Sequence, residues 1–69
     1  MTVEEALQVD AHNDPSDVRE QAIYVLLTEA AEQIRLGEIA KSQSFTLAAY
    51  KRLEAHSFML RRVERTQSA

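Results

Sequence analysis

The feature that most constrains this chain of 69 residues is its one glycine, Gly37. Segments with helical periodicity lead up to it from Pro15 and continue beyond it to about Arg65. A glycine just past a helical segment is typical of a helix C-terminus, because glycine adopts the left-handed backbone conformation without a Cβ penalty. The sequence therefore predicts an all-α fold, an antiparallel helical hairpin that turns at Gly37.

We expect one domain over residues 1–69, with a short N-terminal helix over 1–9 and long helices over 15–36 and 40–65. Thr2 and Glu5 form a capping-box pattern at the start of the short helix. Asp14 and Pro15 predict the start of the first long helix, with Asp14 as N-cap and Pro15 at the first helical position. The short helix cannot persist alone in water, so it must pack on the long ones.

Each long helix carries more apolar residues than a two-helix hairpin can bury. At about 100° per residue, Leu27 and Ile34 fall on one stripe of the first long helix. Leu53 and Leu60 fall on the main stripe of the second. We expect these four residues to be the most buried in the protein.

Apolar residues outside these stripes are the candidates for binding a partner. The first long helix has a second stripe, and the second long helix has a leucine and a phenylalanine three turns apart on its opposite side. These candidate residues are Val18, Ala22, Val25, Leu47 and Phe58. A helix in a hairpin has only one neighbour, so the second stripe must meet the N-terminal helix, another chain or water.

Composition narrows the classes of function. The chain has no cysteine, which rules out disulfides and thiolate metal sites and fits a cytosolic protein. No apolar run approaches the roughly 20 residues that span a bilayer, and no signal-peptide pattern opens the chain. His12 and His56 have no further ligand or base partners, so we expect no metal, no cofactor and no catalysis. A chain this short is marginally stable alone, which favours a partner subunit.

The net charge of −3 is unevenly distributed. Eight acidic residues precede Arg35, with Arg19 as the one basic residue among them, and the other seven basic residues begin at Arg35. We interpret this as an acidic first helix lying antiparallel to a basic second one. The alternative is that Arg61, Arg62 and Arg65 contact nucleic acid, but an isoelectric point near 5.2 argues against it.

Several residues at characteristic spacing suggest a family. They are Met1-Thr2 with Glu5, Glu29 leading into Gly37, Ala40-Lys41 after the turn, and Leu53-Glu54 beyond it. In these residues and in its length, the chain resembles the small co-chaperones of type III secretion needle subunits, of the YscE/PscE type. It departs from that family at Ser42-Gln43-Ser44, where a Gln-Tyr-Gln stretch is usual, and at Pro15.

The resemblance implies a co-chaperone in the bacterial cytoplasm that binds a larger chaperone built of tetratricopeptide-like repeats. That partner holds the C-terminal helix of the needle subunit, which would otherwise polymerise. Two other hypotheses remain open from the residues alone. One is a homodimeric four-helix bundle acting as a structural or regulatory adaptor. The other is an antitoxin-like helical peptide, which the lack of a DNA-reading module disfavours.

Overall fold

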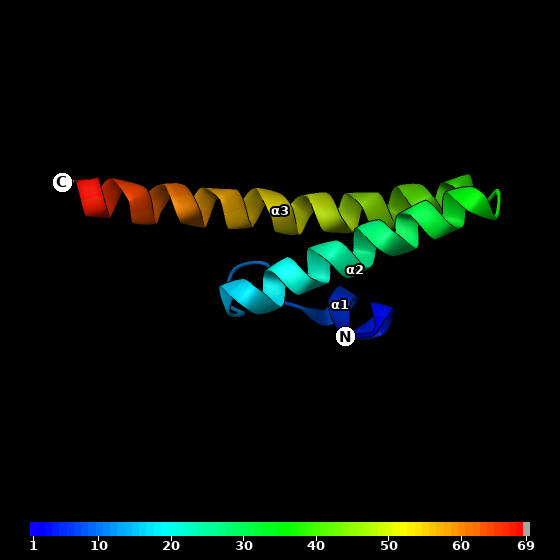
Figure 1. Ribbon diagram of the computed structural model, residues 1–69, viewed down its shortest axis with the longest axis horizontal. Helices are drawn as coiled ribbons and strands as arrows, with labels where there is room; N and C mark the ends of the chain where they lie inside the picture. Colours follow the sequence, from blue (N-terminus) through cyan, green and yellow to red (C-terminus); the bar gives the residue numbers. More distant parts are fainter. Residues whose placement is uncertain (69) are drawn as a thin grey trace.

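The computed structural model describes the backbone of residues 1–68 and the side-chain surroundings of residues 1–56. It contains helices α1 (Val3–Gln8), α2 (Ser16–Arg35) and α3 (Ile39–Ser68). The two long helices lie antiparallel and in contact, and α1 packs against α2 (Figure 1). Residues 1–68 contain no strand, so the predicted all-α hairpin with a short N-terminal helix is confirmed.

The turn between α2 and α3 is a left-handed helix cap at Gly37, whose φ is +79°. The Gly37 amide donates to the Ile34 carbonyl at 3.0 Å, and the Glu38 amide donates to the Gln33 carbonyl at 2.8 Å. These two bonds are those of a Schellman motif, which satisfies carbonyls that the end of a helix leaves without partners. The predicted role of the glycine is therefore confirmed.

Gly37→Ala should lower the free energy of unfolding by about 1 kcal/mol, because a Cβ in the left-handed region costs roughly 1–2 kcal/mol. An added Cβ would meet no heavy atom within 4 Å, so the cost is conformational and not steric. Urea unfolding measures the change, with Glu38→Ala as a control at a neighbouring position of ordinary φ. A Gly37→Ala protein with an unchanged urea midpoint would contradict this account of the turn.

The predicted capping box of α1 is present. The Glu5 amide donates to Thr2 Oγ1 at 3.1 Å, and the Thr2 amide donates to Glu5 Oε1 at 3.1 Å. The Thr2 amide and hydroxyl both favour the ionised form of Glu5 and hold the pKa of its carboxyl below its ordinary value. These bonds define where α1 begins.

The start of α2 differs from the prediction. Pro15 is the N-cap and Ser16 the first helical residue, whereas we expected Asp14 at the cap and Pro15 within the helix. The reason is that the Asp14 carboxylate accepts a hydrogen bond from the Asp10 amide at 2.6 Å. Asp14 therefore closes the linker between α1 and α2, and its carboxylate makes no capping bond to α2.

Asp10 organises that linker. Its Oδ1 accepts from the amides of His12 at 2.8 Å and Asn13 at 3.1 Å, and its Oδ2 accepts from the Asn13 side chain at 3.0 Å. The His12 amide, followed by the Asn13 side chain, lowers the pKa of Asp10 below its ordinary value of 3.8. The linker turn therefore depends on the ionised form of Asp10.

Acidification should weaken the fold through Asp10. Because its pKa is lower in the folded protein than in the unfolded chain, the stabilisation is complete above about pH 3.8 and is lost as pH falls through the folded value. We therefore expect the difference in urea midpoint between wild type and Asp10→Asn to hold at pH 6 and to shrink below about pH 4. A difference that stayed constant down to pH 2 would show that the ionised carboxylate is not what stabilises the turn.

The core lies where α1 packs across the α2–α3 pair. Its buried members are Ala6, Val9, Ala22, Leu26 and Ala49, and Val18, Val25, Phe45 and Ala48 pack against them with partial exposure. Three of the five buried residues are alanines, which let the helix backbones approach closely. Nearer the turn, the buried Ser42 hydroxyl donates to the Ala30 carbonyl at 2.8 Å and joins α3 to α2.

The predicted core was wrong for three of its four residues. Leu27, Ile34 and Leu53 are 44%, 59% and 45% exposed, and Leu60 lies outside the residues whose side chains are described. The physical reason is α1. It covers the stripe of Val18, Ala22 and Val25, whereas no third helix covers Leu27, Ile34 and Leu53 at the other edge of the α2–α3 contact.

Candidate partner-binding surface

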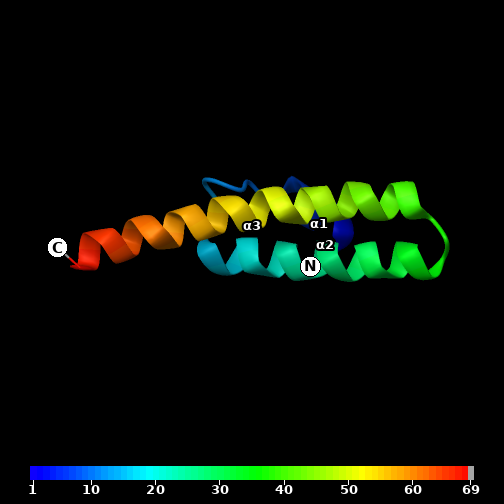
Figure 2. The same ribbon diagram turned by 90° about the horizontal axis from the view of Figure 1, so that it is seen from above.

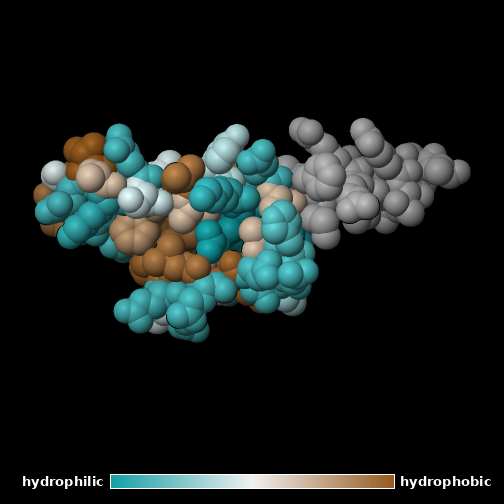
Figure 3. All heavy atoms as spheres, turned by 180° about the vertical axis from the view of Figure 1, so that it is seen from behind, coloured by the Kyte–Doolittle hydropathy of each residue, from teal (hydrophilic) through white to brown (hydrophobic). Residues whose placement is uncertain are grey.

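Helix α1 determines which side of the hairpin is covered. Ala6 of α1 and Val9, which caps the end of α1, are buried in the core, and Arg52 of α3 donates to the Leu7 carbonyl of α1 at 2.8 Å. The same guanidinium donates to the Ala48 carbonyl at 2.8 Å. In Figure 3, apolar side chains remain visible as a brown band between α1 and the hairpin. The chain itself therefore covers this side in part.

The opposite side carries an exposed apolar surface, which we name the open face. Its members are Tyr24 and Leu27 of α2, Ile34 near the end of α2, and Ile39, Leu47, Tyr50 and Leu53 of α3, all between 44% and 73% exposed. At about 100° per residue, Leu27 lies about 140° around α2 from the core residue Ala22, and Leu53 about 100° around α3 from Arg52. Figure 2 views the two long helices with α1 behind them.

The open face contains two hollows between α2 and α3. The first, near the turn, is lined by Ile34 on α2 and by Ile39, Ser42, Gln43, Thr46, Leu47 and Tyr50 on α3. The second, nearer the start of α2, is lined by Glu20, Ile23, Tyr24 and Leu27 on α2 and by Leu53 and His56 on α3. Apolar side chains predominate in both, so each hollow suits an apolar side chain of another molecule.

A histidine and a carboxylate close the end of the second hollow. His56 is 7% exposed, and its Nε2 lies 3.1 Å from Glu20 Oε1. The Glu20 side chain is 55% exposed, so it remains accessible to a partner while His56 holds it in place. The Nδ1 atom of His56 is buried and has no hydrogen-bond partner among the described residues. The contact of His56 with Glu20 therefore joins α3 to α2 at this end of the hairpin.

The predicted partner-binding residues are divided between the two sides of the hairpin. Ala22 is fully buried, and Val18 and Val25 are partly buried against the core that α1 completes. Leu47 is 54% exposed and belongs to the open face. Phe58 lies outside the residues whose side chains are described. Of the predicted docking residues that the structure describes, only Leu47 is freely exposed.

Sequence reasoning missed most of the open face because it assigned the larger stripe to the core. The residues it did not propose for binding are Tyr24, Leu27, Ile34, Ile39, Tyr50 and Leu53. One signal could have identified them: the stripe of Val18, Ala22 and Val25 has only short apolar side chains, which allow a third helix to approach. A short helix with a good capping box needs such a stripe to pack on.

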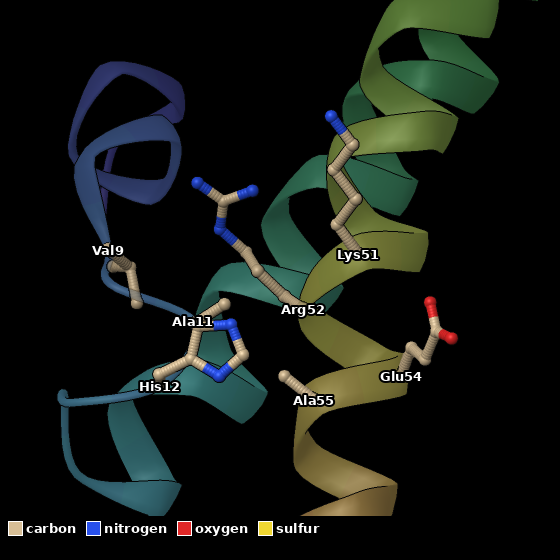
Figure 4. A pocket seen from close by; sticks show the side chains of 7 residues that line it. All are labelled: Val9, Ala11, His12, Lys51, Arg52, Glu54 and Ala55. Atoms are coloured by element: carbon tan, nitrogen blue, oxygen red, sulfur yellow. The ribbon is translucent and has the colours of Figure 1, made fainter.

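A further cleft lies on the α1 side, lined by Val9, Ala11, His12, Lys51, Arg52, Glu54 and Ala55. Figure 4 shows Arg52 extending from α3 towards α1, with the His12 ring beside it near Ala55. The guanidinium already bonds two carbonyls, so Arg52 fastens α1 to α3. Within residues 1–56, no three His, Asp or Glu side chains are placed to hold a metal ion.

Comparisons of the chain with protein-family models, curated proteins and solved structures give no match. In the part of the chain that the structure describes, no helix combines the length and the apolar character that crossing a bilayer requires. The open face and the resemblance noted in the sequence are therefore the features that bear on function.

Proposed function

We propose that this chain is a small co-chaperone of a bacterial type III secretion system. It binds a tetratricopeptide-like chaperone in the cytoplasm and, through it, helps to keep the needle subunit soluble and unpolymerised. The observation that carries the proposal is the open face, a two-helix apolar surface on the side that α1 leaves uncovered. The resemblance to needle co-chaperones supplies the identity of the partners.

The size of the open face is adequate for such a role. Seven large side chains, between 44% and 73% exposed, present on the order of several hundred Å² of apolar surface, a size at which an exposed patch is often functional. Covering a few hundred Å² contributes roughly 5–10 kcal/mol at about 25 cal/mol per Å². The translational and rotational entropy lost on association offsets much of this free energy. The stability of the complex therefore depends on the whole face being covered. Tetratricopeptide-like repeats consist of paired helices that can lie in such a groove.

Co-expression tests the proposal. The chain should be produced together with the tetratricopeptide-like chaperone and the needle subunit encoded beside it, and the complex analysed by size-exclusion chromatography with light scattering. We expect one 1:1:1 complex and a needle subunit that stays soluble only when both chaperones are present. A stable homodimer of this chain that binds neither protein would instead favour the adaptor of four-helix-bundle type.

A further inference from the structure

On each long helix, residues that line the two hollows recur at intervals of seven positions. On α2, Glu20, Leu27 and Ile34 are each seven residues apart, and on α3 so are Leu53, Thr46 and Ile39. The rows run side by side in opposite directions: Leu27 shares the second hollow with Leu53, and Ile34 shares the first with Ile39 and Thr46. One step corresponds to about 10 Å along a helix. Such a repeat matches a third helix with heptad-spaced apolar residues.

The charge in the groove is confined to one end. Among the described residues that line the two hollows, Glu20 is the one carboxylate, and no lysine or arginine is present. The Glu20 carboxylate lies one heptad step beyond Leu27 and is held by the buried His56. A helix in the groove therefore meets uncharged, mainly apolar side chains over two steps and a carboxylate at the third.

We propose that the open face accepts one amphipathic helix of a different protein, with apolar residues in two successive heptads and a lysine or arginine in the next, opposite Glu20. This deepens the proposed function, on which it rests for the role of the open face as a docking site. A second copy of the chain would present the same two rows. Neither row contains a lysine or arginine to face Glu20, so a second copy lacks the complementary charge.

Designed peptides test this charge pattern on the full chain. The probe is a fluorescent peptide three heptads long, with leucine at positions a and d of two heptads, lysine at position a of the third, and alanine and glutamine elsewhere. One control peptide has its lysine moved to the outward position f, and another has glutamate in place of the lysine. On wild type, we expect the f-position control to bind about two- to five-fold more weakly than the probe, within the range for an exposed ion pair. The glutamate peptide should bind about ten-fold more weakly than the probe.

Substitutions of Glu20 in the protein provide the matching half of the peptide experiment. Glu20→Lys should invert the order, so that the glutamate peptide binds more tightly than the lysine peptide. Glu20→Gln should make the affinities for the lysine and glutamate peptides equal. This second variant keeps the test informative if Glu20→Lys destabilises the protein. Leu53→Asp should abolish binding of all three peptides. Circular dichroism of each variant confirms that the helices are retained.

Three results would overturn the inference. The first is that the lysine probe shows no saturable binding. The second is that wild type binds the lysine and glutamate peptides with equal affinity. The third is that the chain forms a homodimer which the Leu53→Asp substitution dissociates but which the probe does not disrupt. These failures are distinguishable from failure of the proposed function. If the peptide order holds but the tetratricopeptide-like chaperone does not bind, the docking helix belongs to another protein. If that chaperone binds equally well to wild type and to the Glu20 variants, the proposed function is supported, but the proposed pairing of Glu20 with a lysine or arginine is wrong.

Discussion

Leu26→Ala should lower the free energy of unfolding by about 3 kcal/mol, within the 2–5 kcal/mol range for truncating a buried leucine. Leu26 has no exposed surface and is the largest fully buried side chain among the described residues. Its neighbours Ala22 and Ala49 are already small, so they cannot fill the cavity. A chain of this length has a stability of only about 3–10 kcal/mol. The substitution should therefore leave the protein close to unfolding at 37 °C.

Leu27→Ala is the matched control, because it makes the same chemical change at the next position of the same helix. Leu27 is 44% exposed, and we expect its truncation to cost less than about 1 kcal/mol. Urea unfolding followed by circular dichroism compares the two variants directly. Equal losses for Leu26→Ala and Leu27→Ala would show that the hairpin packs through the stripe we assign to the open face.

Leu53→Asp should reduce the affinity for the tetratricopeptide-like chaperone by more than about 100-fold, because it places an unpaired carboxylate in the middle of the docking face. Leu53 is 45% exposed, so the aspartate remains hydrated in the free protein and the fold should survive. Isothermal titration calorimetry measures the affinity. Circular dichroism at the same concentration verifies that the helices are intact.

Leu7→Asp is the control for that experiment. Leu7 is also 45% exposed, but it lies on α1, away from the open face. The same substitution at the same exposure should leave binding within about two-fold. Val25→Asp does not provide a clean test, since Val25 packs against the core and a carboxylate there would unfold the hairpin. Loss of binding in both Leu7→Asp and Leu53→Asp would contradict the assignment of the docking surface to one side.

The fold could be predicted because its signals are local. The capping box of Thr2 and Glu5 and the glycine at position 37 each act through hydrogen bonds within a few residues. The N-cap of α2 was missed because Asp14 has a second candidate partner, the Asp10 amide, at nearly the same distance along the chain. A sequence pattern does not rank two local bonds that compete for one carboxylate.

The docking surface could not be predicted because it depends on where α1 packs. Both long helices have two apolar stripes, and periodicity does not say which stripe meets its neighbour. Size suggested Leu27 and Leu53 for the core, whereas close packing of three helices favours the alanines at positions 22 and 49. Arg52 also fastens α1 on that side, through a bond between residues 45 positions apart. Such a contact leaves no periodic trace in the sequence.

The tight cap at Gly37 also sets the order in which the chain assembles. Contacts next to it close short loops, such as the bond from Ser42 to Ala30 across 12 residues, and short loops lose the least entropy on closure. We therefore expect the contacts between α2 and α3 to form first near Gly37 and then progressively further from it. Folding should take microseconds to milliseconds, as is usual for chains of low contact order. The bond from Arg52 to Leu7 spans 45 residues and closes the longest loop, so we expect the attachment of α1 to α3 to come last. Any hairpin that forms before α1 packs leaves Val18, Ala22 and Val25 without their cover, so that species is the one most prone to aggregate.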